Sequence, residues 1–260
     1  LGMALVFLGI GVGLADPRYG LPEVPRLTVQ IVLDASRSML AQDGPEGRTR
    51  WQTAVSLLDR LWNESPTSIH FGVDLLTGDT IPLVPPGEDR TLLREALRAV
   101  TPGTFGSPGT SLGRGLPQVV SQVERTSPTI LLLITDGEEN ESRGYDSDDC
   151  TAVVSSALST GRVSFGCVGP AQAAGFFRSA GIPSACVRDW YGGGSDLAAV
   201  TAEVSKGIAA FADARAAGLS AIEDFFSAPV SGFGDGVRLR VTIGKGSTAR
   251  RQVVVLDRWD

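Results

Sequence analysis

Three oxygen-bearing side chains follow one apolar run near the start of the chain. The run Ile31-Val32-Leu33 ends at Asp34, and Ser36 and Ser38 follow at alternate positions. A strand that ends at Asp34 would turn into a loop that brings one carboxylate and two hydroxyls into a small space. Such hard oxygen donors suit Mg²⁺, with Mn²⁺ or Ca²⁺ as alternatives. The DxSxS spacing therefore predicts half of a divalent-metal site.

Two further oxygen donors stand at comparable positions later in the chain. A second apolar run, 129–135, ends at Asp136, and a glycine-containing segment, 103–109, leads to Thr110 at the start of an expected helix. In an open parallel sheet the loops after the strands meet at one edge, where α/β proteins place their ligand sites. Each residue alone is typical of a turn or a helix cap. Together they predict one metal site, made of Asp34, Ser36, Ser38, Thr110 and Asp136.

With these five residues in this order, the sequence resembles the von Willebrand factor type A (vWA) family, in which DxSxS, a Thr and an Asp form the metal-ion-dependent adhesion site. The resemblance implies that Ser36 and Ser38 are direct ligands. It implies that Asp34 holds the site directly or through water. Thr110 and Asp136 would exchange between direct and water-mediated contact. The implied function is metal-dependent protein binding, in which an Asp or Glu carboxylate of the partner completes the coordination.

The resemblance covers roughly residues 27–213. Within the family, the segment 36–43 and the apolar stretch before it are most similar to the bacterial membrane-anchored Bat-type aerotolerance proteins. That similarity implies a cell-envelope location, on a side of the membrane that the sequence leaves open. It also implies an alternative function, an adaptor for a MoxR-type AAA+ ATPase in complex assembly or metal insertion. Asp43 precedes Gly44-Pro45, and we interpret it as a turn residue rather than a ligand.

The hydrophobic periods along the chain predict the elements that position these residues. Strands are expected at 27–33, 68–76, 79–83, 129–135, 163–168 and 185–188, and helices at 51–62, 90–100, 110–123, 148–159, 171–180 and 195–214. Alternating strands and helices imply crossover connections and parallel pairing, whereas the short Thr77-Gly78 link is typical of an antiparallel pair. We expect an α/β, doubly wound, Rossmann-like sheet that is mostly parallel, with one antiparallel edge strand and helices on both faces.

The sequence divides into three parts. Residues 1–26 contain an uncharged apolar stretch, 1–15, and a linker. Because the chain does not begin with Met, we interpret the stretch as the remnant of a longer membrane helix, with a signal-peptide core or a buried helix as alternatives. Residues 27–214 are expected to form the vWA domain. Residues 215–260 are expected to be a linker and a β-hairpin appendage, since apolar and polar residues alternate over 237–243 before a turn-rich segment. The hairpin would be part of a second, truncated domain or would pack on the linker 222–236.

The composition disfavours nucleic acid as a partner and does not decide whether the cysteines form a disulfide. A formal net charge of −6 and the lack of a sustained basic stripe disfavour nucleic acid, since phosphate binding needs clustered cations. Charged residues make up 20% of the chain and hydrophobic residues 42%, which is typical of a folded protein. Cys150, Cys167 and Cys186 lack zinc-site spacing. They are expected to be buried thiols, or to form one disulfide in an exported domain.

Two enzyme interpretations are disfavoured by the same sequence. Residues 109–113 match the GxSxG nucleophile elbow, but the segment before them is loop-like. The only histidine, His70, precedes Ser111, whereas α/β hydrolases place the histidine last. A metal-dependent hydrolase that uses Asp34 would need a second acid at phosphatase spacing and a nearby Lys, and neither is present. We therefore expect a binding module and not an enzyme.

Overall fold

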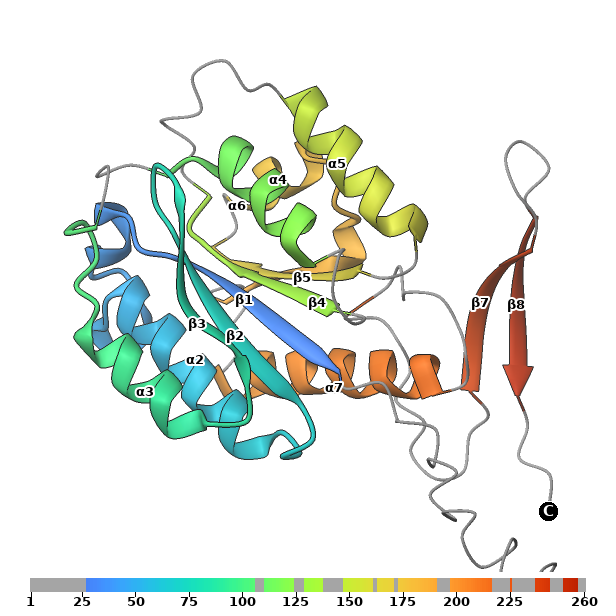
Figure 1. Cartoon of the computed structure of the whole chain (residues 1–260), viewed down its shortest axis with the longest axis horizontal. Helices are drawn as coiled ribbons and strands as arrows, with labels where there is room; N and C mark the ends of the chain where they lie inside the picture. Colours follow the sequence, from blue (N-terminus) through green and yellow to red (C-terminus); the bar gives the residue numbers. More distant parts are fainter. Residues whose placement is uncertain are drawn as a thin grey trace, which may run out of the picture.

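The computed structural model describes residues 27–105, 110–123, 129–137, 147–160, 163–170, 173–190, 197–216, 225, 237–243 and 250–256. Its centre is a six-stranded sheet in the order β3-β2-β1-β4-β5-β6 (Figure 1). Neighbouring strands are parallel except β2 and β3, which are antiparallel. The strands are β1 (Thr28–Asp34), β2 (His70–Leu76), β3 (Thr80–Gly87), β4 (Thr129–Ile134), β5 (Val163–Gly169) and β6 (Val187–Asp189). The predicted mostly parallel sheet with one antiparallel edge is confirmed.

Helices cover both faces of the sheet, as predicted. Helices α2, α3 and α7 lie on one face, and α4, α5 and α6 lie on the other (Figure 1). Their bounds are α2 (Arg50–Glu64), α3 (Arg90–Ala99), α4 (Leu112–Val123), α5 (Ser147–Thr160), α6 (Ala173–Ser179) and α7 (Leu197–Ala216). Three short 3-10 helices, η1 (Arg37–Leu40), η2 (Pro45–Gly47) and η3 (Ser184–Cys186), stand in the connections.

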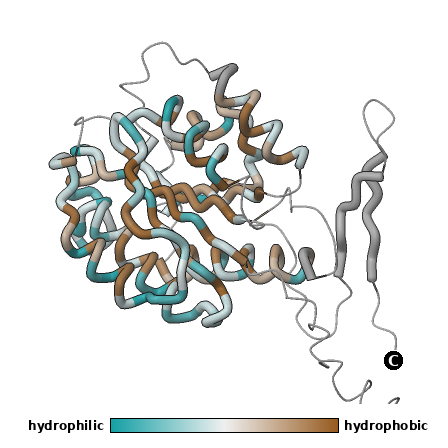
Figure 2. Tube along the Cα trace, in the orientation of Figure 1, coloured by the Kyte–Doolittle hydropathy of each residue, from teal (hydrophilic) through white to brown (hydrophobic). Residues whose placement is uncertain are grey.

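The central strands form the core because helices cover them on both sides. All residues of β1, β4 and β5 are buried, and Figure 2 shows the hydrophobic colours concentrated along the strands. Such continuous burial is what a parallel sheet between two helical layers requires. Helix α2 contributes Trp51, Leu58 and Trp62 to this core. Val55, on the same helix, is partly buried and packs against this core.

Strand β3 is longer than the sequence predicted. It continues to Gly87, although Pro82, Pro85 and Pro86 lie within it. A proline has no N–H to donate to a neighbouring strand, so prolines are confined to edge strands. Here β3 has only β2 as a neighbour, and its pairing with β2 contains register shifts. The prolines are tolerated because the other edge of β3 has no partner strand in this sheet.

One aromatic residue that follows α7 completes the core. Phe225 is fully buried, although it lies beyond the end of the predicted domain at residue 214. Its ring fits against two glycines, Gly166 on β5 and Gly207 on α7. A Cβ at these positions would approach the ring to 2.8 Å and 2.5 Å, respectively. The packed unit therefore includes a residue from the segment after α7.

Helix α4 contains Pro117, and the structure compensates for it. Pro117 has no N–H to donate to the carbonyl of Gly113, four residues earlier. The thiol of Cys150 on α5 donates to that carbonyl at 3.7 Å. Cys150, Cys167 and Cys186 are all buried, and none of the three forms a disulfide. Of the two alternatives for the cysteines, the structure supports buried thiols.

The last two described strands form a separate two-stranded sheet. At the C-terminal end, β7 (Val237–Ile243) pairs with β8 (Arg250–Leu256) as an antiparallel hairpin, as predicted. The apolar stretch 1–15, which we interpreted as a membrane-helix remnant, lies outside the described residues. Among the helices that are described, none has both the length and the apolarity that a membrane crossing needs.

Candidate metal centre

Asp34 is the last residue of β1, and its buried carboxylate is the centre of the candidate site. Oδ1 accepts a hydrogen bond from the backbone N–H of Ser36 at 2.8 Å. Oδ2 accepts one from the hydroxyl of Thr135 at 2.6 Å. The backbone N–H of Ala35 donates to the carbonyl of Leu76, at the end of the neighbouring β2. These contacts fix the carboxylate at the carboxyl-terminal edge of the sheet.

The two serines of the DxSxS motif follow directly. Ser36 is the N-cap of η1, and Ser38 lies within that short helix. Their hydroxyl oxygens are 2.8 Å apart. Ser36 is buried, whereas Ser38 is half-buried. The 3-10 turn thus brings both hydroxyls to one side of Asp34, with Ser38 nearer to solvent.

Thr110 reaches the same carboxylate from the segment before α4. Its hydroxyl lies 3.4 Å from Oδ1 and 3.3 Å from Oδ2 of Asp34. The next residue, Ser111, donates its N–H to the carbonyl of Thr77, after β2. Before residue 106, the N–H of Gly103 donates to the carbonyl of Ala35. Backbone contacts therefore anchor both described ends of this loop beside the site.

Asp136 stands two residues beyond the end of β4 and is fully buried. Between them, Thr135 donates to Asp34 and accepts a hydrogen bond from the N–H of Gly137 at 3.0 Å. Gly137 has a φ of +75°, and a Cβ there would lie 2.4 Å from the Cα of Ala173. Only glycine tolerates both this positive φ and this close approach of Ala173, so a larger residue at position 137 would be strained. Thr135 was not among the predicted site residues.

Arg50, also missed by the sequence analysis, is the first residue of α2 and binds Asp136. Its Nη1 donates to Asp136 Oδ2 at 2.8 Å. Its Nη2 donates to Asp43 Oδ2 at 2.7 Å, and its Nε contacts both carboxylate oxygens of Asp43. The interpretation of Asp43 as a turn residue was incomplete, since its carboxylate holds this arginine. The hydrogen bonds to Asp43 and Asp136 raise the pKa of Arg50.

The electrostatics of the site favour a cation. The pKa of Asp34 is raised to about 6, first by burial and then by the nearby carboxylate of Asp136, whereas the hydrogen bonds from Thr135 and Ser36 oppose the shift. Two carboxylates in one buried space repel each other when both are ionised. A divalent cation between them would relieve this repulsion.

The donor set fits a hard divalent cation. Hydrogen bonds link Ser38 to Ser36, Ser36 to Asp34, and Thr110 to Asp34. Asp136 interacts electrostatically with Asp34. All five side chains offer oxygen, which is the ligand type of Mg²⁺ and Ca²⁺. In the described part of the chain there is no group of three or more His, Cys, Asp or Glu that suits a metal. A site here would therefore depend on the hydroxyls. That these residues bind metal stays a prediction.

The residues of the GxSxG interpretation are not brought together. Ser111 lies just before α4, Thr110 before it is not in a strand, and residues 101–105 form turns and bends. His70 starts β2, and its Nε2 is 2.9 Å from Glu88 Oε1. Ser111 binds the backbone after the other end of β2. Among the residues that the structure describes, His70 and Ser111 therefore lie at opposite ends of β2.

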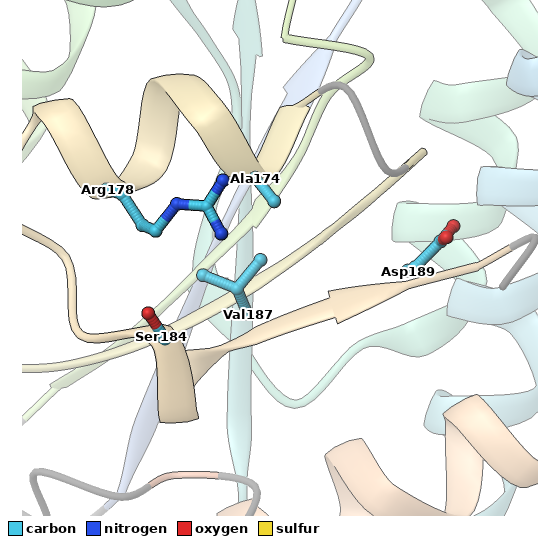
Figure 3. Close-up of a pocket in the computed structure, with 5 residues that line it drawn as sticks. All are labelled: Ala174, Arg178, Ser184, Val187 and Asp189. Carbon is cyan, nitrogen blue, oxygen red and sulfur yellow. The ribbon is translucent and has the colours of Figure 1, made fainter.

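A pocket of about 360 Å³ lies elsewhere, between α6 and β6 (Figure 3). Figure 3 shows Arg178 of α6 reaching over Val187, while Asp189 points away at the end of β6. Ala174 and Ser184 complete the lining. None of the five predicted metal-site residues lines this pocket.

Comparison with known families decides the identity of the fold. The profile of the von Willebrand factor type A domain matches residues 29–139. This chain contains a vWA domain. The matched residues include β1, the DxSxS motif, Thr110 and Asp136, and the vWA fold accounts for the strand order described above. No curated protein sequence matches the chain.

Solved structures resemble this vWA domain. The vWA protein of Catenulispora acidiphila is 18% identical over 71% of this chain and 42% of its own, with a TM-score of 0.52. Proximal thread matrix protein 1 from the mussel byssus is 17% identical over 71% and 48%, with a TM-score of 0.52. BatB from Bacteroides thetaiotaomicron is 25% identical over 55% and 66%, with a TM-score of 0.44. The chain thus spans slightly less than two thirds of BatB and less than half of the other two.

Proposed function

We propose that this chain is a divalent-metal-dependent protein-binding module and not an enzyme. The convergence of Asp34, Ser36, Ser38 and Thr110 at the carboxyl-terminal edge of the sheet carries the proposal. These hydroxyls and Asp136 would hold Mg²⁺, with Mn²⁺ or Ca²⁺ as alternatives. Neutral hydroxyls leave much of the positive charge of the ion uncompensated. An Asp or Glu carboxylate of a partner would therefore bind strongly at the open side, next to the half-buried Ser38.

The second part of this proposal concerns the location and the partner of the module. The similarity of segment 36–43 and its preceding apolar stretch to Bat-type proteins supports a module tethered to a bacterial membrane by its N-terminal segment. The same similarity supports the second candidate function, an adaptor for a MoxR-type AAA+ ATPase. Both functions use the same metal site and differ in the protein that supplies the carboxylate.

The test begins with metal binding by the whole chain. Calorimetric titration with Mg²⁺ and Mn²⁺ should give saturable binding in the wild type. Binding should be lost in Asp34→Ala and weakened in Ser38→Ala, with both variants folded by circular dichroism. Ser121→Ala, which changes an exposed hydroxyl on α4 that bonds Gln118, is the matched control and should bind as the wild type does. A folded wild-type chain that binds neither ion would refute the proposal.

The binding of a carboxylate to the metal ion needs a separate measurement. Mn²⁺ bound to the chain enhances the relaxation of water protons through its coordinated water. Acetate should displace part of this water and lower the enhancement, whereas acetamide, which has similar size and no charge, should not. Equal effects of the two solutes would contradict a coordination position that prefers carboxylates.

A further inference from the structure

We propose that Arg50 is a resident cation that competes with the metal ion for Asp136 and thereby sets the metal affinity of the site. The inference rests on the proposed function, because it concerns the same site. Arg50 lies on α2, outside the five oxygen donors, and contributes no ligand itself. Its role would be to neutralise Asp136 when metal is absent and to yield that carboxylate when metal arrives.

The contact with Asp136 is buried and direct. Nη1 of Arg50 lies 2.8 Å from Oδ2 of Asp136. The Arg50 side chain is 10% exposed and that of Asp136 is fully buried. A buried carboxylate needs a charged partner or a metal, since burial without one costs several kcal/mol. In the metal-free chain, Arg50 supplies this compensation for Asp136.

Asp43 allows Arg50 to exchange partners without leaving the site. The guanidinium has five N–H donors, and those on Nε and Nη2 contact Asp43. The Asp43 side chain is 50% exposed, so water shares in its solvation. When a metal ion takes Asp136, the contacts with Asp43 would keep Arg50 in place. The cation would then remain near the ion and repel it.

The backbone at Arg50 is fixed, so the guanidinium stays near Asp136. Thr49 and Gln52 form a reciprocal capping box at the start of α2. The N–H of Arg50 donates to the carbonyl of Ala41, which joins the helix to the loop that carries Asp43. The first turn of α2 and the two carboxylates therefore hold the cation at a defined position beside the metal site.

The signs of the charge changes give a pattern that a purely structural role would not give. Arg50→Gln removes a positive charge near the ion, so metal should bind about tenfold more tightly. Arg50→Lys keeps the charge, so its affinity should stay within about threefold of the wild type. Asp43→Asn removes a negative charge and should weaken binding. If Arg50 only oriented Asp136, both Arg50 variants would bind metal more weakly.

The experiment is calorimetric titration of Mn²⁺ into the whole wild-type chain and the three variants, with thermal melts in chelator and in saturating Mn²⁺. In chelator, Arg50→Gln should melt below the wild type, because Asp136 loses its partner. The rise in its melting temperature on adding Mn²⁺ should exceed that of the wild type. If Arg50→Gln does not fold in chelator, refolding on addition of Mn²⁺ supports the inference, and failure to refold overturns it.

The remaining outcomes separate this inference from the proposed function. Wild-type binding with equal or weaker binding by folded Arg50→Gln overturns the inference alone. No binding by any chain overturns both the inference and the proposed function. Binding by Arg50→Gln but not by the wild type would refute the proposed function and would overturn the inference as well, because Arg50 would then exclude the ion instead of yielding Asp136 to it.

Discussion

The hydroxyl of Thr135 donates to Oδ2 of Asp34 at 2.6 Å, although the two residues are 101 positions apart in the sequence. The same hydroxyl accepts a hydrogen bond from the N–H of Gly137 at 3.0 Å. Thr135 therefore joins the end of β1 to the residues that follow β4. A separation of the two at the site would break the hydrogen bond between Thr135 and Asp34.

Replacing Thr135 tests this connection. Thr135→Val removes the hydroxyl with little change in volume and leaves Asp34 and the Gly137 N–H each without one partner. We expect a loss of roughly 1–3 kcal/mol in the free energy of unfolding, measured by urea denaturation without metal. Thr135→Ser keeps the hydroxyl and should lose less than half as much. A stability of Thr135→Val equal to that of the wild type would contradict a stabilising role of the hydroxyl.

The second prediction concerns Phe225 and the extent of the domain. Its ring is fully buried against β5 and α7, so Phe225→Ala should lower the free energy of unfolding by roughly 3–5 kcal/mol. Urea denaturation of the whole chain measures the change. An effect below 1 kcal/mol would mean that Phe225 contributes little to the stability of the core.

The two glycines that lie against the Phe225 ring, Gly166 and Gly207, allow a more specific test of this packing. Gly207→Ala adds a Cβ that would lie 2.5 Å from the Phe225 ring, so it should destabilise the wild type. In the Phe225→Ala background the clash is absent, and the same change should cost little. A double-mutant cycle should therefore show strong coupling between the two positions. Additive effects would contradict this packing.

The fold was predictable because its signals are local. The apolar strand runs and the helical periods can be read within short windows, and they give the order of the elements. Strand ends place Asp34 and Asp136 at one edge once the sheet is taken as parallel. Thr135 had a signal that was overlooked. Leu33 pairs with Ile134, so continuing the register places Asp34 beside Thr135.

The contact between Arg50 and Asp136 could not be predicted in the same way. Arg50 lies 86 positions from Asp136, and their contact depends on how the start of α2 sits over the sheet. No short-range pattern encodes that placement. The burial of Phe225 is a similar case, since it depends on two glycines that come together only after β5 and α7 have packed. Contacts between elements, unlike the elements themselves, need the three-dimensional arrangement.

The helix cap before Arg50 can be tested separately. The side chain of Thr49 accepts from the N–H of Gln52 at 3.1 Å, and Gln52 accepts from the N–H of Thr49 at 2.9 Å. Thr49→Ala should lower the free energy of unfolding by about 1 kcal/mol. Thr49→Ser keeps the acceptor and should remain near the wild type. Thermal melts at fixed pH compare the three chains, and an unchanged melting temperature in Thr49→Ala would contradict a stabilising cap.

The last prediction concerns Asp74, a buried carboxyl on β2 away from the metal site. Burial raises its pKa to about 6, and a hydrogen bond with Gln30 opposes the shift. Below a pH of about 4 the group is protonated in both the folded and the unfolded chain. Between about pH 4 and pH 6 the folded chain retains a proton that the unfolded chain releases, so the stability falls as the pH rises. Above about pH 6 the penalty is constant, on the order of 2–3 kcal/mol.

Asp74→Asn should therefore be more stable than the wild type at pH 8, and its advantage should shrink as the pH falls from 6 towards 4. Asp34 has a raised pKa in the same range, but it titrates in both chains, so the difference between their stability curves isolates Asp74. Urea denaturation from pH 4.5 to pH 8 in chelator measures this difference. Glu95→Gln, at an exposed position on α3, is the matched charge-removal control. A flat difference for Asp74→Asn as well would mean that the carboxyl is solvated and that its pKa is not raised.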